Sequence, residues 1–223
     1  MAIKTKEKTA LVFGSTGLTG RELTRLLLLD EHYEKIKVFV RKTTGISNSK
    51  IIEIIDKLED PNIIAGEIVG DDLYCCLGTT MKKAGSRKAF EWVDLELPVG
   101  IAAIASKNGI KKFLIVSSLG ANSSSASFYM RTKGIMEKRV LKIPFQQTTI
   151  FRPSMLLGNR KEIRFGEKIG QVVFPALSFL FIGSLRKYRA IEAIKVAKAM
   201  IKLANSVSST TVVESDEISE IAK

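Results

Sequence analysis

Short apolar runs alternate with longer segments of helical periodicity along most of the chain. The runs are rich in β-branched residues, which is typical of buried parallel strands. We predict strands at 9–13, 36–40, 50–56, 73–77, 113–116 and 148–151, and a late strand at 210–213. The run 50–56 fits a strand or a helix, and its isoleucines favour the strand. Helices are expected at 21–29, 86–107, 127–142 and 191–203, with a short helix at the end.

The alternation of strands and helices predicts an α/β fold with a doubly wound parallel sheet and right-handed crossovers. We expect the strand order 3-2-1-4-5-6 with helices on both faces. No internal repeat or linker interrupts the pattern, so residues 1–223 are expected to form one Rossmann-type domain. Within it, about 151–223 would contribute a small substrate lobe.

A glycine-rich turn joins the first predicted strand to the first helix. Its sequence is Gly14-Ser15-Thr16-Gly17-Leu18-Thr19-Gly20, with GxxGxxG spacing. In dinucleotide-binding folds the first glycine permits the turn, the second lets the backbone approach a pyrophosphate, and the third lets helix and strand pack closely. The free N–H groups of the helix then face the phosphates. Such a turn alone is a weak signal, but its place between a strand and a helix near the N-terminus favours nucleotide binding.

A basic pair follows the second predicted strand. Arg41 lies 21 residues past Gly20, where NAD-specific proteins usually carry an acidic residue for the ribose 2′-hydroxyl. Arg41 and Lys42 would instead hold a 2′-phosphate through charge-assisted hydrogen bonds. The pair therefore favours NADPH over NADH, while a solvated basic pair in a loop is the plainer alternative.

Tyr129 and Lys133 lie four residues apart on a predicted helix and therefore share one face. This helix follows the fifth strand, whose carboxyl end carries Ser118 at the edge where open α/β sheets bind ligands. An ammonium group makes a neighbouring phenol a better acid, so Tyr129 is a candidate proton donor to a carbonyl oxygen. Lys133 would hold the nicotinamide ribose and Ser118 would orient the substrate. The alternative is an exposed Tyr and Lys on a surface helix, since YxxxK also arises by chance.

The chain of 223 residues carries a net charge of +12, from 35 basic and 23 acidic residues. This charge suggests an anionic ligand, an acidic partner or an anionic surface. The lysines are scattered and do not form one stripe with aromatic residues between them. We therefore expect no nucleic acid partner.

Cys75 and Cys76 are adjacent in a predicted strand, so their side chains point to opposite faces and no disulfide framework is expected. No His or carboxylate stands at ligand spacing from them, and we expect no metal site. The charged N-terminal residues lack the apolar run of a signal peptide, and a cytoplasmic location is expected. His32 follows the first helix and is expected to be exposed.

The longest apolar stretch, 169–183, contains Pro175 and is too short to span a bilayer. It suits a core helix or an apolar lid over a substrate pocket. Contact with a membrane surface is a third reading, although the stretch lacks an amphipathic basic face.

Five motifs follow one another in a fixed order. They are GSTGLTG at 14–20, CLGTT with KAG at 76–85, SSLGA at 117–121, YMRTKG at 129–134, and FRP at 151–153 continuing through Leu156 to Arg164. In these motifs the chain resembles the atypical short-chain dehydrogenase/reductases of the Tat-interacting-protein oxidoreductase group. The resemblance spans residues 10 to about 170 and rests most specifically on the second and fifth motifs.

The resemblance implies bound NADPH, with Tyr129 as proton donor and acceptor. Together with the whole glycine turn, the expected cofactor contacts are Gly14, Ser15, Thr16, Gly17, Leu18, Thr19, Gly20, Arg41, Lys42, Leu77, Gly78, Thr79, Tyr129, Lys133, Leu156 and Arg164. The family carries Arg-Arg where this chain has Arg41-Lys42, which keeps the charge and loses one bidentate fork. Asp94 stands about where many relatives carry a helix Asn used for proton relay, although an Asp in a helix more often bonds locally or faces water.

The expected function is NADPH-dependent reduction of a small-molecule carbonyl compound by Ser118, Tyr129 and Lys133. The alternative is an NADPH-binding sensor or scaffold that acts through a protein partner. A sugar-nucleotide epimerase or dehydratase would usually need a larger C-terminal lobe than the roughly 70 residues that remain here, and ranks below simple reduction.

Overall fold

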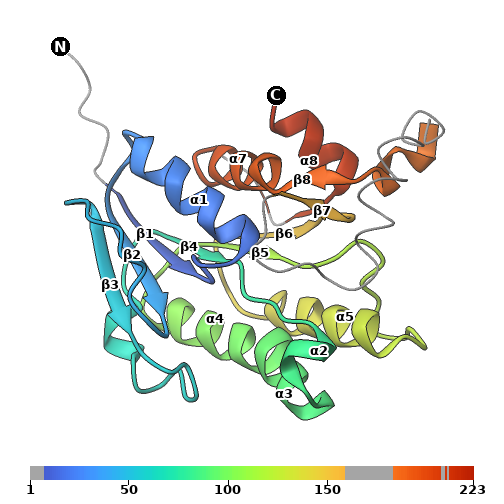
Figure 1. The fold of residues 1–223 in the computed structure, drawn as a ribbon, viewed down its shortest axis with the longest axis horizontal. Coiled ribbons are helices and arrows are strands. Elements are labelled where there is room, and N and C mark those ends of the chain that lie inside the picture. Colours follow the sequence, from blue (N-terminus) through green and yellow to red (C-terminus); the bar gives the residue numbers. More distant parts are fainter. Residues whose placement is uncertain (1–7, 159–182, 207–208, 210) are drawn as a thin grey trace.

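The computed structural model describes residues 8–158, 183–206, 209 and 211–223. Its centre is a seven-stranded parallel sheet with helices on both faces (Figure 1). The strands are β1 (Lys8–Phe13), β2 (Tyr33–Val40), β3 (Ile51–Ile55), β4 (Asp72–Cys75), β5 (Lys112–Val116), β6 (Gln147–Arg152) and β9 (Thr211–Glu214). Their order is β3-β2-β1-β4-β5-β6-β9. The doubly wound α/β fold and the order of its first six strands are thus confirmed, and β9 extends the sheet beyond β6.

Helices pack against both faces of the sheet. On one face lie α1 (Leu18–Leu29), α7 (Ala193–Ala204) and α8 (Ser215–Ile221), and on the other lie α4 (Leu97–Lys107) and α5 (Phe128–Val140) (Figure 1). Each face has its own core, because alternate residues of a strand point to opposite sides. In β1, for example, Leu11 packs toward α4 and Val12 packs toward α1 and α7. Burial on both faces explains why the strands read as nearly continuous apolar runs.

A small two-stranded sheet, β7 (Leu156–Leu157) with β8 (Ile191–Glu192), lies outside the main sheet. Residues 191 and 192 were expected to open a helix, but α7 begins two residues later. Helices α7 and α8 and strand β9 pack in the layers of the main sheet, while β7, β8 and the 3-10 helix η4 (Gly183–Tyr188) lie outside that sheet. Most of the stretch 169–183 lies outside the described residues.

The predicted helix at 86–107 is present and contains a π-helical turn. It consists of α3 (Arg87–Glu91), a π-helical turn η2 (Trp92–Glu96) and α4, with the short helix α2 (Met81–Ala84) before it. Pro98, in the first turn of α4, has no N–H to donate to the carbonyl of Asp94 four residues earlier. A π-helical turn accommodates such a missing bond and is frequent at functional sites. In this chain it carries Asp94 into the interior, where 1% of the residue is exposed.

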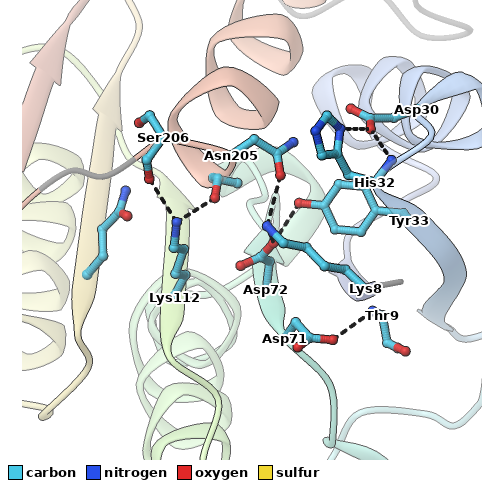
Figure 2. A network of polar contacts seen from close by, with 12 residues as sticks. Lys8, Thr9, Asp30, His32, Tyr33, Asp71, Asp72, Lys112, Asn205 and Ser206 are labelled. Carbon is cyan, nitrogen blue, oxygen red and sulfur yellow. Dashed lines mark hydrogen bonds and ion pairs between the residues drawn. The ribbon is translucent and has the colours of Figure 1, made fainter. Parts of the chain in front are cut away.

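A polar network joins the starts of four strands at the amino edge of the sheet (Figure 2). The Asp72 carboxylate accepts hydrogen bonds from the Tyr33 hydroxyl at 2.6 Å and from the Lys8 ammonium at 3.1 Å. The Tyr33 hydroxyl also forms a hydrogen bond of 2.7 Å with the Tyr74 hydroxyl. Burial raises the pKa of Tyr33, and the neighbouring Tyr74 and Asp72 raise it further, so this phenol stays protonated and able to donate.

The same network fixes the C-terminal end of α7. The Lys112 ammonium donates to the carbonyl oxygens of Ala204 at 2.6 Å and Ser206 at 2.9 Å, and Lys8 donates to the Asn205 side chain at 2.8 Å. Cations suit the negative end of the helix dipole and satisfy its last carbonyls. Because ligands of such sheets bind at the carboxyl edge, this network is structural.

Tyr33→Phe should destabilise the fold by about 1–3 kcal/mol, because the buried Tyr74 hydroxyl loses its bond to Tyr33 and Asp72 loses one of its two bonds, keeping the one from Lys8. Urea unfolding measures the loss. Tyr188→Phe is the matched control, since Tyr188 is 47% exposed and its loss of a hydroxyl should change stability by less than about 0.5 kcal/mol. Equal stabilities of the two variants would show that the network does not stabilise the fold.

Candidate active site

The glycine turn brings the start of α1 against the ends of β1 and β4. Gly14 has a φ of +81°, and a Cβ there would lie 2.6 Å from the Cys76 carbonyl oxygen. A Cβ on Gly20 would lie 2.1 Å from the carbonyl oxygen of Gly14. Both distances are far below any real contact, so only glycine permits this approach of helix to strand.

The turn leaves hydrogen-bond donors at the positive end of α1. Gly17 is the N-cap residue and supplies no side-chain cap for the first helical amides. Ser15 is buried, and its hydroxyl has no hydrogen-bond partner among the described residues. Thr16 and Gly17 are exposed, Leu18 is half-buried and Thr19 is buried. Uncapped amides, a buried hydroxyl and the helix dipole together fit an anion such as a pyrophosphate.

The basic pair lies at the carboxyl end of β2, where Arg41 and Lys42 are both exposed. A depression of about 330 Å³ lies beside it, lined by Arg41, Ile55, Asp56, Lys57, Glu59 and Ile63. The following loop is tied to β3 by Glu53, whose carboxylate accepts from the Thr43 hydroxyl at 2.7 Å and the Thr44 amide at 2.8 Å. Hydrogen bonds from Thr44 and Thr43 lower the pKa of Glu53. Glu53 was not predicted from the sequence, although it is the charged position within the isoleucine run of β3.

Lys133 lies on α5 and is buried with Asp94. Its ammonium nitrogen is 2.6 Å from Asp94 Oδ1, and the two side chains are 5% and 1% exposed. Asp94 Oδ2 also accepts a hydrogen bond from the Thr79 amide at 2.8 Å. Burial by itself lowers the pKa of Lys133, but the charge of Asp94, with a smaller contribution from Tyr129, outweighs it and the pKa is raised. The lysine is therefore held as a cation.

The turn after β4 completes this cluster. A Cβ on Gly78 would lie 3.5 Å from Asp94 Oδ1 and 3.9 Å from Lys133 Nζ, so the exposed backbone of Gly78 lies against the pair. Of the readings left open for Asp94, the one in which it faces water is excluded, because the residue on the π-helical turn is 1% exposed. A charged residue inside an apolar helical segment just before Pro98 was the available signal.

The remaining predicted residues lie around this cluster. Tyr129 is half-buried one turn before Lys133, and its ring is 5.7 Å from the buried ring of Phe90. Ser118 follows β5, and its hydroxyl approaches the Leu119 carbonyl at 3.4 Å. Among the described residues, no hydrogen bond joins Ser118 to Tyr129 or Lys133. Leu77 and Leu156 are half-buried, and Arg164 lies outside the described residues.

A bidentate ion pair anchors α5 to the end of β6. Glu137, one turn after Lys133, accepts from Arg152 Nε at 3.0 Å and from Arg152 Nη2 at 2.5 Å. The Glu137 side chain is 5% exposed. Paired, parallel bonds of this kind fix orientation as well as distance. They hold the helix that carries Tyr129 and Lys133 in place on the sheet.

Cys75 and Cys76 are free thiols, and burial raises the pKa of Cys75 to about 11. The His32 side chain is 50% exposed, as expected, and lies beside Asp30 near the amino edge (Figure 2). Among the described residues there is no group of three or more potential metal ligands. In the same part of the chain, no helix combines the length and the apolar character needed to cross a membrane.

Comparison with known proteins agrees with this geometry. The sequence profile of a family described as NAD(P)H-binding matches residues 14–171. The chain belongs to this NAD(P)H-binding family. It is 34% identical to "Protein FMP52, mitochondrial" of Candida albicans over 88% of this chain and 87% of that protein. It is 31% identical to "Protein HTATIP2" of Rattus norvegicus over 89% of this chain and 81% of that protein, which confirms the resemblance drawn from the motifs.

The fold is shared with solved structures of much lower sequence identity. The enzyme WbmH of Bordetella bronchiseptica, in complex with NAD+, superposes with a TM-score of 0.70 at 14% identity. The match covers 93% of this chain and 75% of that one. The NAD(P)-binding Rossmann fold of the chain is thus shown by sequence and by structure.

The expected cytoplasmic location is contradicted by these comparisons. The relative from Candida albicans and further relatives of the same name are described as mitochondrial. The expectation rested on a missing secretory signal and on unpaired cysteines. Neither feature separates the cytoplasm from other compartments inside the cell.

Gly14→Ala should abolish NADPH binding and lower the stability by on the order of 3–5 kcal/mol, because the new Cβ meets a backbone carbonyl. The matched control is Gly109→Ala. Gly109 has a φ of +82° but no atom within 4 Å of the position of a Cβ. The control should lose only roughly 1–2 kcal/mol of backbone strain. Urea unfolding and NADPH titration measure both effects, and equal losses would contradict the steric account.

Proposed function

We propose that the protein is an NADPH-dependent oxidoreductase of the short-chain dehydrogenase/reductase type that reduces a small-molecule carbonyl group. Membership of the NAD(P)H-binding family and the Rossmann fold support a nicotinamide-dependent oxidoreductase. The observation that carries the proposal is the buried cation of Lys133, one helical turn from Tyr129 and against Gly78 at the carboxyl edge. The glycine turn lies at the same edge of the sheet.

The residues at this edge fit the parts of NADPH in order. The uncapped start of α1 and the buried Ser15 hydroxyl suit the pyrophosphate. Arg41 and Lys42 suit the 2′-phosphate at the adenosine end, where Glu53 holds the following loop. Gly78 and Lys133 suit the nicotinamide ribose, because an exposed glycine lets a ligand approach the buried ammonium.

The protein residues supply binding, orientation and a proton. When bound, NADPH would provide a hydride for the carbonyl carbon. Tyr129 would donate its phenolic proton to the carbonyl oxygen, as a general acid within hydrogen-bond reach. Ser118 would orient the same oxygen, and the ammonium of Lys133 would hold the nicotinamide ribose.

We place the substrate side of this single domain near the β7–β8 pair. Leu157 and Gly158 of this region line a cavity of about 250 Å³ together with Leu18 and Glu22 of α1. The cavity therefore adjoins the helix whose first turn belongs to the proposed cofactor site.

NADPH should bind more tightly than NADH, and Arg41→Asp should narrow or invert the difference. Losing one charge-assisted phosphate contact lowers affinity by roughly ten- to a hundredfold, or about 1.5–3 kcal/mol. Titration of both cofactors at moderate salt measures the ratio. Lys198→Asp, an equal charge change at an exposed position of α7, should leave the ratio unchanged. Equal affinities of the parent protein for both cofactors would rule out a phosphate contact at Arg41.

Tyr129→Phe should leave NADPH affinity nearly unchanged and lower carbonyl turnover by about 10²–10⁴-fold, the usual contribution of general acid catalysis. A screen of quinones, aldehydes and ketones with NADPH supplies the assay. Tyr188→Phe is the control, because it also removes a phenolic hydroxyl, but at an exposed position, and it should keep the parental turnover. If Tyr129→Phe keeps the parental rate, Tyr129 is not the proton donor. If no carbonyl compound oxidises NADPH, the protein is an NADPH sensor or scaffold instead.

A further inference from the structure

One carboxylate joins two segments of the proposed cofactor site. Asp94 Oδ1 contacts the Lys133 ammonium of α5 at 2.6 Å, and Oδ2 accepts from the Thr79 amide in the turn after β4 at 2.8 Å. Lys133 and Thr79 come from chain segments more than fifty positions apart, and Asp94 comes from a third. A single side chain thus fixes the lysine relative to the turn.

The burial of Lys133 depends on this carboxylate. An ammonium group enclosed by protein without a counter-charge carries a large desolvation penalty, which a well-placed carboxylate offsets. The titratable groups that face Lys133 are Asp94 from η2, Tyr129 from α5 and Cys75 from β4. Asp94 is the carboxylate among them, and the pKa of the Cys75 thiol is raised to about 11 by burial. The counter-charge of Lys133 at neutral pH therefore comes from Asp94.

The position of Asp94 is built into the backbone. Pro98 removes the hydrogen bond that an α-helix would make to the Asp94 carbonyl, and the π-helical turn at this point directs the side chain inward. On the other side, Gly78 lies close to both charged groups and is exposed. A ligand that follows the Gly78 backbone therefore comes within reach of the ammonium.

We propose that Asp94 is the positioning residue of the site, which keeps Lys133 charged and fixed beside Gly78 so that NADPH affinity does not depend on pH between neutral and alkaline conditions. The inference rests on the proposed function, because it assigns Lys133 to the cofactor. It differs from a proton-relay role, since the carboxylate contacts the lysine directly and need not touch the substrate.

The sign of the pH dependence follows from the ion pair. The raised pKa of Lys133 means that its charged form stabilises the fold below the unfolded pKa, and that this contribution is lost only as the pH rises through the folded pKa. Without the charge of Asp94, burial dominates and lowers the pKa of Lys133. An Asp94→Asn variant should therefore lose the Lys133 proton, and with it a strong hydrogen-bond donor, at lower pH than the parent.

The first test is the affinity for NADPH, followed by cofactor fluorescence from about pH 6.5 to 9.5. The NADPH affinity of the parent should vary by less than about twofold over this range. The affinity of Asp94→Asn should fall by about tenfold toward the alkaline end, which is the equivalent of one charge-assisted hydrogen bond. Asn keeps an oxygen that can accept from Thr79, and its NH2 group then faces the ammonium, so the change removes both the charge and the acceptor of Lys133. Asp71→Asn, at the amino edge, is the matched control and should keep the parental profile. An Asp94→Asn profile that parallels the parental one overturns the proposal.

The second test needs neither cofactor nor turnover. Asp94→Asn leaves a buried, unpaired ammonium, and adding Lys133→Met replaces it with an apolar chain of similar length. The double variant should therefore melt at least about 5 °C above Asp94→Asn. A double variant that melts no higher than Asp94→Asn overturns the pairing.

These outcomes separate the inference from the proposed function. If the double variant recovers stability and the affinity profile shifts as expected while no carbonyl compound oxidises NADPH, Asp94 positions Lys133 in a cofactor-binding protein that is not a reductase. If turnover depends on Tyr129 but the pH profile of NADPH affinity of Asp94→Asn parallels the parental one, the proposed reductase activity is supported and the proposed role of Asp94 is contradicted.

Discussion

The close approach of α1 to the ends of β1 and β4 is the constraint on which the rest of the structure depends. It is possible only because Gly14 and Gly20 lack side chains. It places the positive end of α1 at the carboxyl end of β1, which pairs with β2 on one side and β4 on the other. Helix α7 then packs beside α1 and completes that face of the sheet. A fold-determining contact and a phosphate-binding geometry thus arise from the same residues.

The two edges of the sheet use buried charge in different ways. At the amino edge, the Lys8 ammonium bonds to Asp72, and the Lys112 ammonium bonds to the end of α7. At the carboxyl edge, the Asp94–Lys133 pair lies against an exposed glycine, and the hydroxyl groups of Ser15 and Ser117 are buried without a hydrogen-bond partner in the described part of the chain. Open donors next to a fixed cation are what a polar, anionic ligand requires. The contrast explains why function is assigned to one edge and stability to the other.

The sequence predicted best where one physical requirement dominated. Strands buried on both faces must be apolar throughout, so the main strands, such as β1 and β5, were visible as short runs. The glycine turn was visible because steric demands leave no choice of residue at Gly14 and Gly20. The YxxxK spacing placed Tyr129 and Lys133 on one helix, which the structure confirms.

Features that depend on tertiary contacts were not predictable in the same way. The π-helical turn occurs just before Pro98. Its effect on Asp94 depends on which side of the helix is buried, and the sequence does not show this. The partner of Lys133 comes from another helix, and the strands β7 and β8 are too short to show a period. The prediction of a cytoplasmic location was wrong for a different reason. Cysteine usage does not distinguish one compartment within the cell from another.

The most direct test of the central claim is a crystal structure of the protein with NADPH at saturating concentration. We expect the bound cofactor to have its pyrophosphate at the start of α1, its 2′-phosphate within hydrogen-bond distance of Arg41, and its nicotinamide ribose against Lys133. Cofactor bound elsewhere, or with its nicotinamide end directed away from Lys133, would contradict the assignment of this edge as the active site.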